Sequence, residues 1–162
     1  PVTSTIESAI TECEAHRQKL ELGEKALSGS FPLSETGLRS LDEERVARLD
    51  QFVYRFTKLQ DSMARRLLPS LYQYLEADTE PRPFLDLLNR LEQLGIVSSV
   101  ARWQELRALR NNLAHDYPEN TARTVATLNE LYRAWRDLAE MYRAARAAYE
   151  RATHEQQQEA DT

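Results

Sequence analysis

The chain has 162 residues, of which 41% are hydrophobic and 29% charged, with only four glycines and six prolines. This length suits one domain, and much charge with little glycine is typical of amphipathic helices rather than of a β-sandwich or barrel. The net charge of −5 excludes a uniformly basic nucleic-acid coat protein but allows a local basic cleft. No apolar run approaches the roughly 18 residues of a membrane span. We therefore predict no contact with a membrane. A single cysteine cannot form an internal disulfide, so we predict a cytoplasmic protein.

The first predicted helix begins at a capping-box pattern, Ser4 with Glu7, and ends near Leu27. Its apolar residues recur at a rough helical period. Cys13 lies on this apolar stripe, which favours a place in the core over a nucleophilic role. Glycine, proline and serine between residues 29 and 37 predict a loop after it.

A second capping box, Ser40 with Glu43, opens the longest predicted helix. This helix carries a continuous apolar stripe to about Ala77, with a kink or restart at Pro69, which lacks the backbone N–H. A short third helix is predicted over residues 83–94.

The fourth predicted helix starts at Ser98 or Ser99 and stops near Asp116, ahead of Pro118. The fifth starts near residue 120 and ends near Ala152. The pattern predicts an all-α, up-and-down bundle of four to five helices. It forms a single domain over residues 1–152, followed by a polar tail over residues 153–162 that frays. The two longest helices exceed what one small bundle needs, which indicates a homodimer formed through them.

Most enzyme signatures are absent from the sequence. There is no glycine-rich phosphate loop, no metal-ligand spacing of His or Cys, and no Gly-x-Ser-x-Gly elbow, so we predict neither a metal nor a cofactor. His16 and His154 lie in polar surroundings, and we predict both at the surface. His115 differs, because it ends the fourth predicted helix within a chemically rich string, Arg110–Pro118.

The spacing within this string allows a functional site. Asn111 and His115 are i,i+4 neighbours on a helix, so the amide can orient the imidazole. Arg110 lies about 140° around the helix from His115, so both reach one substrate atom only if the last turn unwinds or a second copy contributes. The alternative is structural: Arg110 pairs with a carboxylate, His115 caps the helix and Tyr117 fills the edge of the core.

The string resembles the motif of the HEPN superfamily, in the HepT-like toxin branch that pairs with minimal nucleotidyltransferase antitoxins. That branch carries Arg-x4-His-x-Tyr, which is met here by Arg110, His115 and Tyr117, with Asn111 at the polar position after the arginine. An Arg-to-His spacing alone is expected about once by chance in such a chain, whereas the fuller string is far rarer. The resemblance covers about residues 5–150 and includes three more segments: 53–61, 88–95 and 103–107.

The resemblance implies the toxin of a type II- or type VII-like toxin–antitoxin pair, a metal-independent endoribonuclease that cuts RNA, not DNA, at a homodimer cleft. A histidine suits proton transfer at the ribose 2′-OH or the leaving oxygen, and a guanidinium suits the charge of the transition state. His115 is then the general acid/base, Arg110 the phosphate stabiliser and Asn111 the orienting residue.

Tyr117 has a separate implied role, as acceptor of AMP from the nucleotidyltransferase antitoxin in a hetero-oligomer. The anionic adduct would block the cleft. The alternative is a tyrosine that stacks on RNA or packs. Two other functions stay open: a non-catalytic nucleotide- or substrate-binding subunit of a two-component nucleotidyltransferase, and a helical oligomerisation domain without a site.

Local charge gives the candidate RNA contacts. Residues 51–75 carry a charge of +3, with Arg55 and Lys58 among the cations, and Arg102 and Arg107 approach the motif along its own helix. In one cleft these four side chains could hold an RNA backbone. Alternatively they are ordinary surface cations of amphipathic helices.

Overall fold

Every regular element of the computed structural model is a helix across the residues it describes, 1–116 and 121–162, which confirms the predicted all-α class. The side chains of His115 and Asp116 also lie outside the description. No helix in these ranges contains an apolar stretch suited to crossing a membrane. The elements are α1 (Val2–Leu27), α2 (Glu35–Arg39), α3 (Glu43–Ser62), the π-helical turn η1 (Met63–Leu67), α4 (Leu68–Glu76), α5 (Phe84–Gln93), α6 (Val100–Asp116) and α7 (Thr121–Ala160).

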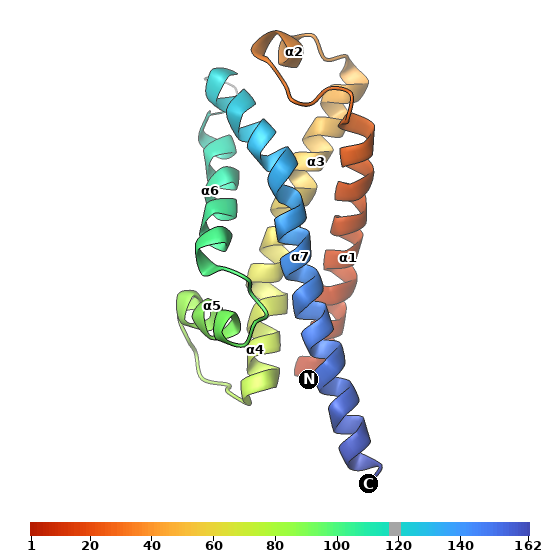
Figure 1. Ribbon diagram of the computed structural model, residues 1–162, viewed down its shortest axis with the longest axis vertical. Coiled ribbons are helices and arrows are strands. Elements are labelled where there is room, and N and C mark those ends of the chain that lie inside the picture. Colours follow the sequence, from red (N-terminus) through yellow and green to blue (C-terminus); the bar gives the residue numbers. More distant parts are fainter. Residues whose placement is uncertain (117–120) are drawn as a thin grey trace.

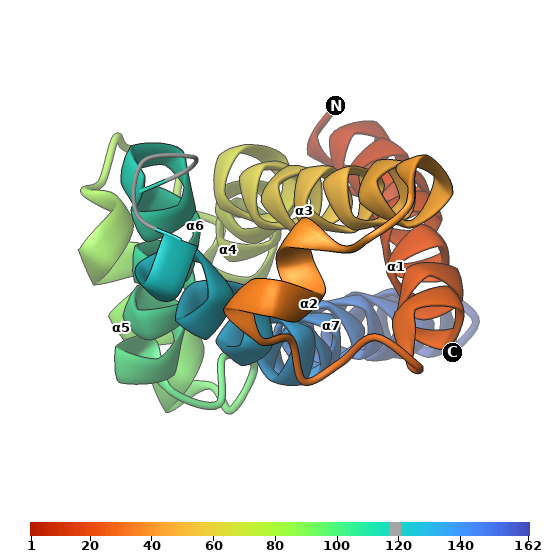
Figure 2. The same cartoon turned by 90° about the horizontal axis from the view of Figure 1, so that it is seen from above.

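The long helices run alternately up and down, as predicted, and α3 continues through η1 into α4 (Figure 1). The most extensive packing joins α1 to α3, and α7 packs along α6. Viewed from above, α2 lies over one end of the bundle, between α3 and α7 (Figure 2). The core between the helices holds large side chains with almost no exposed surface, among them Phe52, Phe56, Trp103 and Tyr142.

The start of the long second helix differs from the prediction. The loop predicted for residues 29–37 overlaps the short helix α2, whose N-terminus is capped by Ser34 accepting a 2.9 Å hydrogen bond from the Gly37 N–H. Ser40 is the C-cap of α2, so it does not cap α3. Asp42 caps α3 instead, accepting from the Arg45 N–H at 2.8 Å, because a carboxylate serves a helix N-terminus as well as a serine does.

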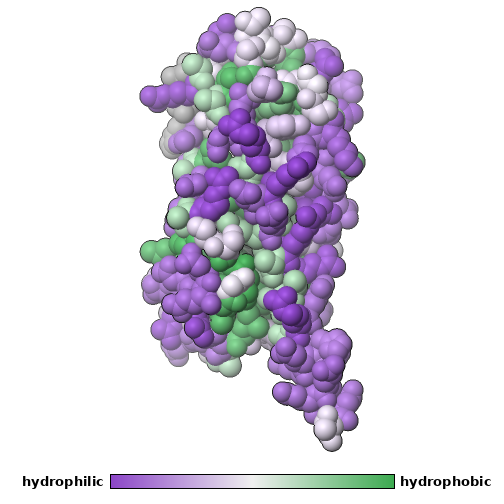
Figure 3. All heavy atoms as spheres, in the orientation of Figure 1, coloured by the Kyte–Doolittle hydropathy of each residue, from purple (hydrophilic) through white to green (hydrophobic). Residues whose placement is uncertain are grey.

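The two terminal helices extend beyond their predicted ends. The helix α1 already begins at Val2, and the Ser4 hydroxyl donates to the Pro1 carbonyl oxygen at 2.9 Å rather than capping. At the other end, α7 continues to Ala160 past the bundle, and its last residues are hydrophilic (Figures 1 and 3). The Tyr74 hydroxyl of α4 donates a 2.7 Å hydrogen bond to Gln156 Oε1 in this last part of α7. The polar composition of residues 153–162 does not predict this contact.

Around Pro69, where a kink or restart is predicted, the structure has the π turn η1, which ends at Leu67, and α4 begins at Leu68. Pro69 lies in the first turn of α4 and has no N–H to donate to a carbonyl of the preceding turn. The wider turn of η1 precedes it, so the chain passes from α3 to α4 without leaving the bundle.

Candidate functional site

Arg110 of α6 forms an ion pair with Asp61 of α3, its Nη1 lying 2.6 Å from Asp61 Oδ1. Both side chains are partly exposed, at 33% and 25%. The pair ties the motif helix to the long helix, so the guanidinium is fixed at the surface between them. The predicted alternative of a carboxylate partner for Arg110 is therefore present, but Nη1 is the only guanidinium nitrogen that bonds to a described residue, which leaves further donors for a ligand.

Asp61 was not predicted as a site residue. It is the only carboxylate among four cations in residues 51–75, and this isolation is the one signal in the sequence that could have singled it out. Its partner is 49 positions away in the chain, so local spacing could not connect them.

The remaining motif residues lie at the end of α6. This helix continues through Asp116, so Asn111 and His115 are one turn apart and the backbone does not unwind between Arg110 and His115. The Asn111 side chain is exposed. The side chain of His115 and the whole of Tyr117 lie outside the described residues.

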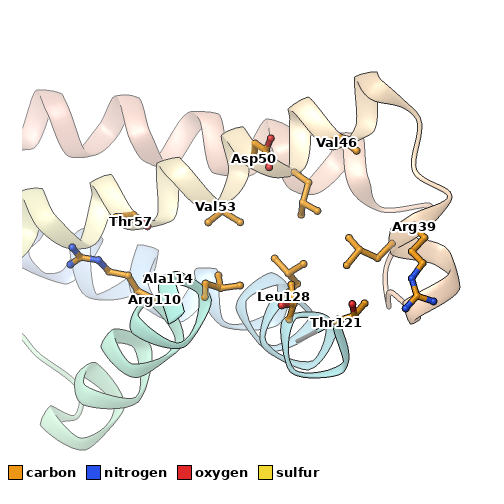
Figure 4. Close-up of a pocket in the computed structure, with 13 residues that line it drawn as sticks. Arg39, Val46, Asp50, Val53, Thr57, Arg110, Ala114, Thr121 and Leu128 are labelled. Atoms are coloured by element: carbon orange, nitrogen blue, oxygen red, sulfur yellow. The ribbon is translucent and has the colours of Figure 1, made fainter. Parts of the chain in front are cut away.

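A groove of about 590 Å³ lies beside the motif, between α3 and α6, with α7 and α2 completing its walls. Its lining is mostly apolar and includes Val53, Leu113 and Leu128. Figure 4 shows Arg110 at one end of the groove and Arg39 at the other. The site thus combines mostly apolar walls with an arginine at each end and the carboxylate of Asp50 between them.

The four predicted RNA contacts differ in whether other side chains already hold them. Arg55 points toward α1, where its Nη1 lies 3.0 Å from His16 Nδ1, and Arg102 is held by Asp137 and Glu105 on two sides. Lys58 and Arg107 have no carboxylate partner in the described part of the chain, and Arg107 is exposed one turn before Arg110.

The predicted surface position of His16 is wrong, whereas His154 is exposed as predicted. His16 is 8% exposed between α1 and α3, because its ring packs against α3, where Arg55 lies beside it. A guanidinium only donates, so His16 Nδ1 accepts from Arg55, and the neutral ring carries its proton on Nε2, 3.8 Å from Glu12 Oε1. The Ser62 hydroxyl donates to Glu12 at 2.7 Å and Arg66 forms an ion pair with it.

Burial lowers the pKa of His16 from its ordinary 6.5, and the charge of Arg55 adds to this. The unfolded chain therefore binds a proton at His16 more readily than the folded one, so the free energy of unfolding should fall as pH drops below about 6.5. Chemical denaturation at a series of pH values measures this loss. It should disappear in His16→Gln and persist in His154→Gln; an unchanged profile in His16→Gln would contradict the assignment.

Among the side chains that the structure describes, those of residues 1–114 and 121–162, no group of three or more His, Cys, Asp or Glu is arranged to hold a metal ion. Cys13 is buried, which confirms its predicted place in the core, and burial raises the pKa of its thiol to about 12, so it is a poor nucleophile.

No family model, no curated protein and no solved structure matches the chain. The function proposed below therefore rests on the chemistry of the site residues and on the sequence motif.

Proposed function

We propose that this protein is a metal-independent endoribonuclease and the toxin of a toxin–antitoxin pair, with Arg110, Asn111 and His115 as its motif. The observation that carries the proposal is the placement of Arg110. Its guanidinium is anchored on Asp61 at 2.6 Å and lies at the surface, with donors left over beside the turn that carries Asn111 and His115. A fixed cation of this kind suits the extra negative charge that develops on a phosphate during chain cleavage.

The proposed reaction is attack of a ribose 2′-OH on the adjacent phosphorus, with loss of the 5′-oxygen of the next nucleotide. The 2′-OH gives its proton to a base, the P–O5′ bond breaks as the new P–O2′ bond forms, and the leaving oxygen receives a proton. An imidazole can perform either transfer near neutral pH. In the proposal His115 does so, with Asn111 orienting it.

The proposal includes a homodimer. Because α6 remains helical to Asp116, positions 110 and 115 of one chain lie about 140° apart around the axis of an ideal helix. A second copy facing the first would supply the missing group, and it would also provide the two imidazoles that the two proton transfers require. Tyr117 is proposed as the acceptor of AMP from a nucleotidyltransferase antitoxin, on the strength of the sequence resemblance.

RNA cleavage in EDTA by the protein expressed without a partner tests the proposal. The wild type should cut a labelled RNA, and Arg110→Ala combined with His115→Ala should not, with an unchanged helical circular dichroism spectrum. The matched control is Arg133→Ala with His154→Gln, an exposed arginine and histidine of α7, which should cut like the wild type. Cleavage that survives the motif double variant would refute the proposal and identify a contaminating nuclease.

A second candidate function, a nucleotide-binding subunit of a nucleotidyltransferase, is favoured by the groove itself. Apolar walls suit a nucleobase, and Arg110 at one end suits a phosphate. Calorimetric binding of ATP that is lost in Arg110→Ala, together with no RNA cleavage at high protein concentration, would select this function over the first.

A further inference from the structure

An exposed aromatic side chain lies on α3 beside the motif. Tyr54 leaves 52% of its surface exposed, and two cations lie over its ring: Lys58 Nζ is 5.6 Å from the ring centroid and Arg55 Cζ is 5.7 Å from it. A tyrosine of the core would hide its ring from water, as Tyr142 does. About half of the Tyr54 side chain is instead open to solvent, and positive charge lies over its ring.

The same face of α3 carries more of the site. Tyr54, Lys58 and Asp61 follow at i, i+4 and i+7, so they lie along one side of the helix, and Arg65 continues the line in η1. The line spans about 16 Å at 1.5 Å per residue. Asp61 is the residue that holds Arg110, so the line passes directly beside the proposed phosphate stabiliser.

The charge along this line is positive once the ion pairs are assigned. The carboxylate of Asp61 is already occupied by Arg110, and neither Lys58 nor Arg65 has a carboxylate partner among the described residues. Arg66, next to Arg65, is held by Glu12 and lies on the other side. The exposed carboxylate of Asp50, one turn before Tyr54, ends the positive stretch.

We infer that Tyr54, Lys58 and Arg65 form a binding strip for single-stranded RNA, in which an unpaired base stacks on Tyr54 and backbone phosphates contact Lys58 and Arg65. This inference rests on the proposed function and names its substrate class. Every base presents a π-face, and stacking on an aromatic ring requires that the base be unpaired, which excludes a duplex at Tyr54. The strip carries the strand past Arg110, where the scissile phosphate would lie.

Fluorescence anisotropy with a labelled single-stranded oligoribonucleotide in EDTA tests the strip. All proteins carry His115→Ala, so that cleavage does not interfere with binding. Adding Tyr54→Ala should weaken binding by about five- to a hundredfold, whereas Tyr54→Phe, which keeps the ring, should bind like the parent. Leu22→Ala, which removes an equally exposed apolar side chain from α1, is the matched control and should have no effect.

The two cations are tested by the salt dependence of the same binding. Lys58→Ala and Arg65→Ala should each reduce the slope of log affinity against log salt by about 0.7, the value for one phosphate of a single strand. Arg45→Ala, an exposed arginine paired with Asp42, should leave the slope unchanged. Affinity for duplex RNA should be the same with and without Tyr54→Ala.

The strip and the proposed nuclease can fail separately. Cleavage that depends on Arg110 and His115, with parental RNA affinity in Tyr54→Ala, overturns the strip alone. Absent cleavage, with RNA binding that still requires the Tyr54 ring, overturns the nuclease alone. If Tyr54→Ala changes the molecular mass of the protein in solution but not its RNA affinity, this face joins protein chains and the strip is overturned. If Tyr54→Ala does not fold, the slopes of Lys58→Ala and Arg65→Ala decide.

Discussion

Arg110→Lys should lower the rate of RNA cleavage by about a hundredfold or more, although the charge is kept. The guanidinium donates from Nη1 to Asp61 and has further N–H groups in a fixed fork for a phosphate. An ammonium that bonds to Asp61 is a point charge turned toward that carboxylate, so it cannot present two parallel donors to a substrate. Single-turnover cleavage at saturating protein measures the loss, because it separates the chemical step from RNA binding.

The ion pair itself provides the control for this prediction. Asp61→Asn keeps the size and a hydrogen-bond acceptor but removes the charge that holds the guanidinium, so we expect a smaller loss of rate than in Arg110→Lys. Both side chains are partly exposed, so the free energy of unfolding should change by less than about 1 kcal/mol in either variant. Equal rates in Arg110→Lys and the wild type would show that Arg110 serves only to join α6 to α3.

The sequence was a good guide wherever structure depends on neighbouring residues. Apolar spacing predicted the helices from α3 onward, and proline at 69 predicted the irregular turn now seen as η1. It failed where a polar residue has a distant partner. The polar neighbours of His16 in the chain predict a surface position, whereas the structure buries His16 against Arg55 of another helix.

The residues of the candidate site also differ in whether their role depends on neighbours in the sequence or on contacts between helices. Arg110 and Asn111 were predicted because their spacing to His115 is local. Asp61 was missed because its role depends on how close α3 and α6 lie in space. Tyr54 differs: it lies about 200° around the helix from the buried Phe52, so the helical period already predicts that it faces outward, and what the structure adds is the pair of cations over its ring.

Trp103→Ala should cost about 3–5 kcal/mol of unfolding free energy, a large part of the stability of a domain this size. The indole is 1% exposed in the first turn of α6, and its ring lies 6.0 Å from that of Phe84, centroid to centroid. It anchors the helix that carries Arg110. Urea unfolding followed by circular dichroism measures the change, and Leu22→Ala, at an exposed site, should stay within about 0.5 kcal/mol of the wild type.

Trp103→Phe separates the contribution of the packed indole ring to the free energy of unfolding from that of its buried N–H group. Its Nε1 is buried and has no hydrogen-bond acceptor in the described part of the chain, and an unpaired buried donor costs about 1–3 kcal/mol. Phenylalanine keeps most of the ring but removes that donor, so the gain offsets much of the lost packing, and we expect a cost well below that of Trp103→Ala. If phenylalanine proves as destabilising as alanine, Nε1 is hydrogen-bonded in solution, for instance to a buried water, and the anchoring of α6 is polar as well as apolar.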